Sequence, residues 1–443
     1  MYSEQYKYLK LISFKKLSQW YVEYYLNDNK IHSKFSIVPL RDLIEPKKDI
    51  IKKDDYDGLL PIVEKIVFKT GKVVFRKVKT TGMNLYALQQ NDLLISNINF
   101  HQGATALNTF GNIVASTHYQ PYVINLELVR PDYLTMVLRT PFFLSVVSGK
   151  KAQGIKNESG YGFVGSFSLP LPQLDEQERL VTNYNDKIKT ANDLELEASQ
   201  IEKDIDAYLL DTLDVSKKSK KRMGKSRQFL IFVRLKDLSR WDIYNEEIIC
   251  RSNSYNNIRL YDVVISKPQY GAGFSSVPYD GKIRYIRITD INEDGSLNED
   301  AVSAKEYSER YLLKENDFLI ARSGNTVGKT FLYTKGIEKA IYAGYLIRFE
   351  LNNSLVVPDF LLAYTKCSVY KEWIKGNMRV SAQPNINSQQ YLDSPIILPP
   401  MDVQNEIVAH IKEQKALAKQ LKQKAASIRE EALKEFENEI FEL

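Results

Sequence analysis

The sequence contains few of the residues on which metal centres, disulfide frameworks and membrane spans depend. It has two cysteines and four histidines among 443 residues. Two cysteines cannot form a secreted disulfide framework or a cysteine-based zinc site. No run of about 18 apolar residues occurs, which argues against a transmembrane helix. The N-terminal MYSEQYKYLKLISFKK has no apolar block of the signal-peptide kind. We therefore expect a cytoplasmic protein with no metal of its own.

The net charge of +6 is unevenly distributed along the chain. Residues 174–214 carry 12 acidic and 4 basic residues, and residues 402–443 carry 9 acidic and 7 basic residues. Residues 215–227 carry 7 basic and no acidic residues, and we interpret them as a solvated linker, with phosphate contact as the alternative. The rest of the chain is mildly basic. A basic surface attracts nucleic acid through counterion release, although solubility alone explains such a balance equally well.

Four short motifs occur twice, in the same order. They pair residues 17–20 with 238–241, 91–95 with 316–320, 131–134 with 358–361, and 171–181 with 398–408. The spacing between the two copies is nearly constant from the first motif to the last. A period this long indicates a duplicated domain rather than a solenoid. The chain is therefore predicted to be two copies of one unit of about 220 residues.

The first part of each unit has the pattern of a mixed domain of strands and helices. Residues 65–78 place β-branched and aromatic residues around Thr70-Gly71, which predicts a hairpin. Residues 282–291 are expected to play the same role in the second unit. Further strands are predicted at NDLLISNI (91–98), NIVAST (112–117), NDFLIAR (316–322) and YLIRFEL (345–351), with NIVAST and YLIRFEL as counterparts. A helix is predicted from each Pro-Asp pair, over 131–147 and 358–374.

The second part of each unit is predicted to be one long helix, since glycine and proline are absent from 173–213 and 401–443. Each helix would be about 40 residues and roughly 60 Å long. Apolar or small residues recur every three or four positions, in the same register in both helices: Tyr184, Ala191, Leu194, Ala198, Ile201 and Ile205, then Ile411, Ala418, Leu421, Ala425, Ile428 and Ala432. This spacing is typical of an antiparallel coiled coil with a head at each end. The alternative is that each helix packs on its own head.

On these residues the sequence resembles the specificity subunit of type I restriction–modification systems over nearly its whole length. The resemblance rests on the doubled LP-x-L/M-D-x-Q-x-x-x-V boundary at 171–181 and 398–408, and on the long helix after each. Leu-Ser-Arg-Trp-Asp at 238–242 and Arg-Ser-Gly-Asn-Thr-Val-Gly-Lys-Thr at 322–330 also look like that family. The first unit departs at 19–21 and at 96–108. Because the heads are the family's variable part, these departures indicate a different target.

The resemblance implies an α+β fold: two tandem α/β target recognition domains, separated by long helices that form an antiparallel coiled coil, in a pseudo-twofold repeat. The domains would be residues 1–173 and 228–400, the spacer helices 174–214 and 401–443, and the basic linker 215–227. Each head would read one half of a bipartite site in double-stranded DNA. The helix pair would set the spacing and dock two methyltransferase subunits, which restriction and translocase subunits join. The chain itself would be non-catalytic and without a cofactor, with S-adenosylmethionine, ATP and Mg on partner subunits.

Catalytic interpretations find little support in the residues. The loop 323–330 resembles a phosphate-binding loop, but Ser323 replaces its first glycine and a strand-like run follows where a helix is required. The prolines at 399–400 lack the flanking residues of a methyltransferase tetrad. Asp132 and Asp359 look like first-turn helix acids rather than nuclease ligands. Four histidines provide little material for a hydrolase triad.

DNA contacts are expected from two polar loops in each head, because base reading needs Arg, Lys, Asn or Gln side chains. The candidates are Asn97, Asn99, His101, Gln102, Lys151, Gln153, Lys156 and Asn157 in the first head, and Arg322, Asn325, Lys329, Asn377, Arg379, Gln383 and Asn385 in the second. For each residue a turn or solvated-surface role is the alternative. Two other classes of protein also remain open: a coiled-coil protein-interaction scaffold, and the specificity chain of a related single-chain restriction enzyme.

Overall fold

The computed structural model describes residues 31–68, 70–78, 80–150, 160–215, 252–378 and 384–442. Two compact units are present, Met1–Leu194 with Gln423–Leu443, and Glu195–Lys422. Each unit therefore takes one half of each long helix. The following sequence-predicted features lie outside the described residues: the motifs at 17–21 and 238–242, the basic run after Val215, and Lys151, Gln153, Lys156, Asn157, Arg379 and Gln383.

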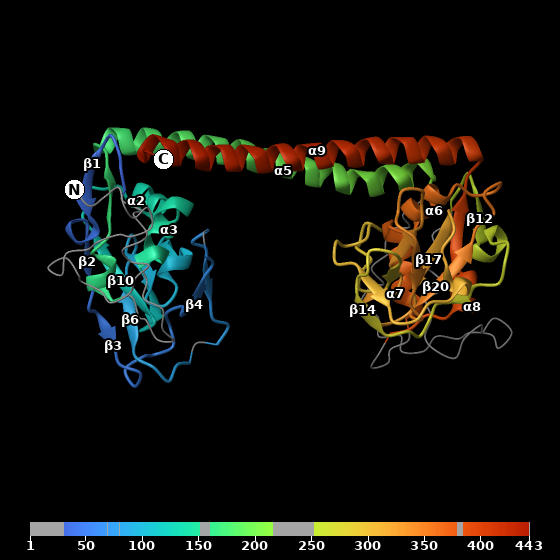
Figure 1. The fold of residues 1–443 in the computed structure, drawn as a ribbon, viewed down its shortest axis with the longest axis horizontal. Helices are drawn as coiled ribbons and strands as arrows, with labels where there is room; N and C mark the ends of the chain where they lie inside the picture. Colours follow the sequence, from blue (N-terminus) through green and yellow to red (C-terminus); the bar gives the residue numbers. More distant parts are fainter. Residues whose placement is uncertain are drawn as a thin grey trace, which may run out of the picture. The chain divides into compact units, whose positions relative to one another are not determined.

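Both units contain a four-stranded sheet with the same strand order. Figure 1 labels β2 and β10 of one sheet and β17 and β20 of the other. In the first unit the order is β2 (Ile44–Pro46), β10 (Tyr119–Ile124), β7 (Leu93–Ser96) and β8 (Thr105–Leu107). In the second unit it is β13 (Gln269–Tyr270), β20 (Leu346–Glu350), β17 (Asp317–Ala321) and β18 (Thr330–Leu332). All neighbours are antiparallel. The sequence repeat is therefore a repeat of topology.

A two-stranded sheet joins the start of each described head to its boundary motif. In the first unit β1 (Ser36–Pro39) pairs with β11 (Ser168–Leu171), and in the second β12 (Asn256–Arg259) pairs with β21 (Pro395–Leu398). Each second strand ends at the leucine of a Leu-Pro pair, and a long helix begins three residues later. Short 3-10 turns are η2 (Leu40–Asp42), η3 (Phe100–Gln102), η6 (Leu260–Val263), η7 (Glu309–Tyr311) and η8 (Gly324–Thr326).

The helices predicted from each Pro-Asp pair begin where expected, but each is two helices. They are α2 (Pro131–Val137) and α3 (Pro141–Lys150), then α6 (Pro358–Tyr364) and α7 (Ser368–Asn377). Pro141 has no N–H to continue the first helix, so it starts the second. In the other unit Cys367 adopts an extended conformation before Ser368. Shorter helices are α4 (Tyr161–Val164) and α8 (Ser388–Leu392).

The remaining strands differ between the heads. The first head has the sheet β3 (Ile50–Ile51), β6 (Leu85–Leu88), β9 (Ile113–Ser116) and the hairpin β4 (Val63–Ile66), β5 (Val73–Phe75). The second has β14 (Ser276–Pro278) paired with β16 (Val302–Ala304), and β15 (Arg284–Ile286) paired with β19 (Ala340–Tyr342).

Two strand predictions are wrong in consequence. Residues 282–291 form no hairpin, because β15 pairs in parallel with the distant β19 and no glycine within the run makes a turn. NIVAST is not the counterpart of β20, because it forms β9 in another sheet while β10 takes the equivalent place. The predicted hairpin at 65–78 is confirmed. Gly71 in its turn has a φ of +69°, and the side chain of Arg139 occupies the space that a Cβ would need.

The long helices are α5 (Leu174–Thr212) and α9 (Met401–Ile440). In the first unit Arg179 pairs with Glu439 and Lys187 with Glu435. In the second unit Lys422 pairs with Glu202 at 2.6 Å, and the rings of Tyr208 and His410 lie 3.9 Å apart. Rising residue numbers in α5 thus meet falling numbers in α9 within each unit, so the predicted antiparallel pairing is confirmed.

The predicted seam of the helix pair is turned away from solvent. Ala191, Ala198, Ile411, Ala418, Ala425 and Ala432 are buried, and Tyr184, Leu194, Ile201, Ile205, Leu421 and Ile428 are partly buried. In the first unit, the ends of the helices also pack on the head, because Leu180, Val181, Phe436 and Ile440 belong to its core cluster. Helix-on-helix and helix-on-head packing are therefore both present.

Candidate nucleic-acid interface

Gln177, the glutamine of the first boundary motif, connects the spacer helix to the head by hydrogen bonds. Gln177 is fully buried. Its Oε1 accepts a hydrogen bond from the N–H of Arg130 at 2.8 Å, and its Nε2 donates to the carbonyls of Leu128 at 3.0 Å and Pro172 at 2.9 Å. One amide thereby joins the residue before α2 to the strand-to-helix junction. Buried polar groups must be paired, so this requirement explains the glutamine in the motif.

The second boundary motif repeats the same three hydrogen bonds. Gln404, also fully buried, accepts from the N–H of Val357 at 2.7 Å. It donates to the carbonyls of Leu355 at 3.0 Å and Pro399 at 2.8 Å. We call these two arrangements the glutamine clamps, of Gln177 and Gln404. They place each head at a fixed orientation to the start of its own helix.

The repeated Asn-Asp pair shapes the entry to the central strand of each head. Asn91 and Asn316 have φ angles of 71° and 69°, a left-handed conformation that asparagine tolerates better than most residues. The carboxylates of Asp92 and Asp317 then accept from the N–H groups of Gln89 and Lys314, both at 2.7 Å. These turns set the direction in which β7 and β17 begin, and the candidate loops follow at the other end of each strand.

In the second head the structure brings the two candidate loops together. The N–H of Gly324 donates to the carbonyl of Pro384 at 3.0 Å, and the N–H of Ile386 donates to the carbonyl of Arg322 at 2.9 Å. Ser323 and Asn385 form an isolated antiparallel bridge. The loop after β17 and the segment before α8 therefore form one surface, although they are far apart in sequence.

Arg322 is held at the centre of this surface. Its Nε lies 3.4 Å from Oδ1 of Asn385, and its guanidinium carbon lies 4.9 Å from the ring centre of Tyr270. The hydroxyl of Tyr270 accepts from the N–H of Ser388 at 3.1 Å. The N–H of Arg322 donates to the carbonyl of Tyr345, whose side chain is 55% exposed. An arginine stacked on an aromatic face is a cation–π pair, which limits its rotamer freedom.

The other described candidates of the second head have different surroundings. Asn325 is exposed on η8. Lys329 is directed inward, since its Nζ donates to the carbonyl of Ile291 at 3.2 Å and lies 3.1 Å from the carboxylate of Glu293. Asn377 is buried within α7 and donates to the carbonyl of Trp373 at 2.9 Å. These bonds commit Lys329 and Asn377 to the head itself.

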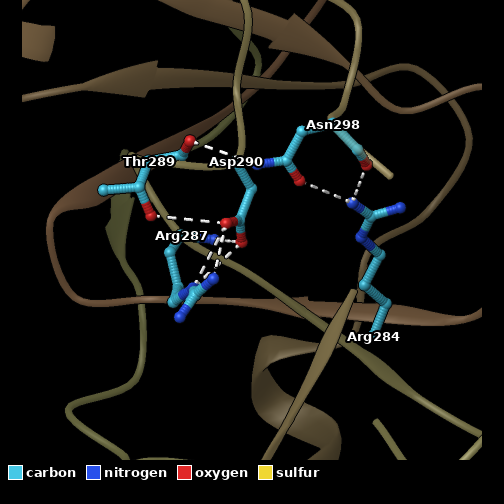
Figure 2. A network of polar contacts seen from close by, with 5 residues as sticks. All are labelled: Arg284, Arg287, Thr289, Asp290 and Asn298. Carbon is cyan, nitrogen blue, oxygen red and sulfur yellow. Dashed lines mark hydrogen bonds and ion pairs between the residues drawn. The ribbon is translucent and has the colours of Figure 1, made fainter. Parts of the chain in front are cut away.

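The loop that receives Lys329 is fixed by the polar network in Figure 2. Asp290 is fully buried and accepts from the N–H of Arg287 at 2.9 Å and from its guanidinium at 2.8 Å. The hydroxyl of Thr289 reaches the same carboxylate, and Arg284 donates to the carbonyl of Asn298 at 2.6 Å. The hydrogen bonds to Asp290 raise the pKa of Arg287. Both arginines therefore serve the shape of the loop.

The first head has the same backbone arrangement with different side chains. The N–H of Asn97 donates to the carbonyl of His118 at 2.9 Å, as Arg322 does to Tyr345. The side-chain amide of Asn97 donates to the carbonyl of Thr117 at 3.2 Å. The hydroxyl of Ser148, near the end of α3, lies 3.4 Å from the carbonyl of His101. The loop after β7 thus lies next to the end of α3.

Asn99 and Gln102 close a tight turn in this loop, with the N–H of Gln102 bonded to the carbonyl of Asn99 at 3.0 Å. Gln102 is exposed, and Asn99 and His101 are partly exposed. Sequence reasoning missed His118, Tyr270 and Tyr345. The signal for two of them was present, because Tyr345 follows His118 at the same spacing that separates the two copies of the boundary motif.

A partly buried cation just after α2 or α6 bonds to a backbone carbonyl in another part of the same head. Arg139 donates to the carbonyl of Thr70 in the first head at 2.9 Å, and Lys366 donates to the carbonyl of Thr330 in the second at 2.9 Å. These two positions also have the spacing of the boundary motifs, so they are equivalent in the repeat. Burial lowers the pKa of Arg139, and it lowers the pKa of Lys366 to about 7.

The described residues contain no group of three His, Cys, Asp or Glu residues arranged for a metal, and none of their helices has the length and apolarity of a membrane span. The loop 323–330 ends in β18, which confirms that a strand follows it where a phosphate-binding loop needs a helix. Asp132 and Asp359 lie in the first turns of α2 and α6, as expected.

Comparison with known proteins identifies the class of the second unit. Residues 259–428 match the family model described as type I restriction modification DNA specificity domain. This stretch runs from the end of β12 through the sheet and into α9. The second unit is therefore a DNA specificity domain of this class, and the resemblance stated from the sequence is confirmed. The family is one of recognition rather than catalytic domains.

One solved structure extends the likeness in fold to most of the chain. A chain from a structure on complex assembly and conformational transition of the type I R-M system has a TM-score of 0.59 at 15% identity, covering 92% of this chain and 97% of that chain. The HsdS subunit from Thermoanaerobacter tengcongensis has 0.46 at 15%, covering 94% and 98%. The S subunit from M. genitalium has 0.42 at 13%, covering 93% and 97%. No curated protein matches. The first likeness confirms the predicted fold of two heads with long helices.

Proposed function

We propose that this chain is the non-catalytic DNA-recognition subunit of a type I restriction–modification complex. Each head reads one half of a bipartite site in double-stranded DNA. The helix pair sets the gap between the halves and docks two methyltransferase subunits, which restriction and translocase subunits join. S-adenosylmethionine, ATP and Mg bind to those partners, and the complex works in the cytoplasm.

The observation that carries this proposal is that the two heads share their structural framework, while the side chains on their equivalent loops differ. The glutamine clamps and the Asn91 and Asn316 turns recur in both heads with nearly equal geometry. At equivalent loop positions the side chains differ, with Asn97 in one head and Arg322 in the other. A molecule that reads two different half-sites needs this combination, because the frame fixes register and the loops supply the base contacts.

An exposed leucine at equivalent positions of the two units is consistent with docking of the same protein twice. Leu128 is 43% exposed and Leu355 is 44% exposed, and both carbonyls are bound by the glutamine clamps. In the first unit this region also borders a surface groove of about 600 Å³ that includes Leu126 and Leu174. Two equivalent exposed positions fit two copies of one partner, here the methyltransferase.

The test is to express the chain with a type I methyltransferase subunit and to map methylated adenines at single-base resolution. The expected result is a two-part motif with a fixed unspecified gap. Exchanging residues 228–401 for those of a related chain should change one half of the motif only. Co-purification without methylation would favour a protein-interaction scaffold, and failure to co-purify would contradict the docking role. Methylation by this chain alone would contradict its non-catalytic character.

A further inference from the structure

We propose that Arg322 reads a guanine in the half-site of the second head, and that Tyr270 and Asn385 position it for this contact. This inference rests on the proposed function and names the residues of that function in one head. Arginine makes its commonest specific base contact through two parallel hydrogen bonds to O6 and N7 of guanine.

The backbone of Arg322 is fixed on both sides. It follows β17, whose five residues are all buried. Its N–H is bonded to Tyr345 and its carbonyl accepts from Ile386, both at 2.9 Å. Because neither bond uses the side chain, the loop position stays the same whatever residue occupies it. The equivalent Asn97 of the first head makes the corresponding bond to His118.

The guanidinium is held on one edge and one face. Asn385 accepts from Nε, and the ring of Tyr270 covers one face. Tyr270 is in turn fixed by the backbone N–H of Ser388. These contacts do not use the two terminal amino groups. Both groups can therefore donate hydrogen bonds to a guanine or a phosphate. Preorganisation lowers the entropic cost of such a contact.

Arg322 also differs in charge pairing from most of the described arginines of this head. Arg284, Arg287, Arg348 and Arg259 all lie within 4.0 Å of a carboxylate, with distances from 2.8 to 3.9 Å, and Arg310 is the exception, lying 5.8 Å from the ring centre of Tyr311. No ion pair involves Arg322 in the described part of the chain. A buried or paired arginine supports the fold, whereas an oriented and unpaired one is suited to an anionic or acceptor-rich ligand.

Asn325, three residues further along the loop, and Tyr345, whose carbonyl accepts from the N–H of Arg322, are both exposed. A base contact is favoured over a phosphate contact, because the side chain is held in one plane. A phosphate can also be bound by the point charge of a lysine, whereas O6 and N7 of a guanine lie in one plane and need two parallel hydrogen bonds. The first head has asparagine at this position, so its half-site is read differently there.

The experiment uses the complex of this chain with its methyltransferase, and a panel of duplexes in which each base pair of the second half-site is varied. Arg322→Ala and Arg322→Lys should reduce the preference for guanine at one position, by about 5- to 150-fold. Preferences at other positions and in the first half-site should be unchanged. Methylation of the unaltered first half-site motif reports that the variants are folded.

Tyr270 tests the positioning role. Tyr270→Leu removes the ring and should relax the preference at the same base position, whereas Tyr270→Phe keeps the ring and should relax it less. A purely structural residue would not change the preference at one base only. The matched control is Arg259→Ala. Arg259 also lies over a tyrosine, Tyr261 at 5.5 Å, but Asp262 and Asp393 lie beside it, so no base preference should change.

Two outcomes would overturn the inference. If Arg322→Ala weakens binding to all sequences alike and lowers the salt dependence by about one charge, Arg322 contacts a phosphate. If the base preferences are unchanged, Arg322 makes no contact. In either case a methylated two-part motif would leave the proposed function standing, whereas the absence of such a motif in the unaltered complex would contradict that function itself.

Discussion

The two heads share a structural framework and differ in the outer strands and loops attached to it. Four features recur in both heads at the spacing of the repeated motifs. They are the sheet order, the glutamine clamps, the left-handed asparagines and the partly buried cations Arg139 and Lys366. The outer strands differ in extent, with a three-stranded sheet and hairpin in one head and two separate strand pairs in the other, although the parallel pairing of Ile62 with Val114 recurs as that of Tyr285 with Ile341. The comparison teaches that duplication preserved the groups that satisfy buried polar atoms, while the exposed loops were free to diverge.

The largest expected effect follows from a charge in the helix seam. Ala191 is fully buried on α5, so Ala191→Glu would bury an unpaired carboxylate and overfill the seam. We expect a loss of about 3–5 kcal/mol in the free energy of unfolding, measured by urea denaturation. The complex should also lose partner assembly or a uniform gap between half-sites. Leu196→Glu on the same helix is the control, since Leu196 is 68% exposed and its replacement should be nearly neutral.

The glutamine clamps allow a direct test of the shared frame. Gln177→Ala and Gln404→Ala each remove three buried hydrogen bonds and leave backbone groups unpaired. Each substitution should cost about 2–4 kcal/mol in the free energy of unfolding, and the two costs should be nearly equal. Gln173→Ala is the control, because Gln173 is exposed. Unequal costs would show that the two boundaries are not equivalent.

Sequence reasoning predicted the shared frame better than the parts that differ. The long helices and the boundary motifs were readable because their signals are local: absent glycine and proline, three-four spacing, and a motif that occurs twice. The glutamine within that motif was visible, but its three bonds were not, since Leu128 lies 49 residues before it.

The failures came from long-range pairing. The run 282–291 had strand composition, yet its partner β19 is distant in sequence, and composition cannot select a partner. The pairing of Arg322 with Tyr270 was missed for the same reason, because the two are far apart in the chain and 28 tyrosines are candidates for such a contact. Lys329 and Asn377 had the right chemistry for DNA contact, but the fold uses their side chains internally.

The partly buried cations Lys366 and Arg139 should differ in how they affect the pH dependence of the free energy of unfolding. The pKa of Lys366 is about 7 in the folded protein, lowered from 10.5 by burial, with Asp294, Glu293, Lys415 and Lys371 around it. Between these two values the unfolded state binds more protons, so the free energy of unfolding should rise with pH from about 7 toward 10.5. Below pH 7 both states are protonated and the cost of burial stays constant.

Lys366→Met should therefore stabilise the protein by about 1–2 kcal/mol at pH 6, with the gain shrinking toward pH 10, as measured by denaturation at each pH. Arg139→Met is the matched variant in the first head. Arginine stays charged throughout this range, so its replacement should give a stability change that does not depend on pH. A pH-dependent effect of Arg139→Met, or a flat one for Lys366→Met, would contradict this account.

The smallest effect concerns the turns that aim the central strands. Asn316→Ala should destabilise the protein by about 1 kcal/mol, because alanine is strained at a φ of 69°, whereas Asn316→Gly should be nearly neutral. The same pair at Asn91 should give the same two values if the turns are equivalent. Thermal unfolding of all four variants measures this directly. If the alanine variants also lower binding of one half-site each, the turn orients the loop that follows its strand; if binding is unchanged, it contributes to stability alone.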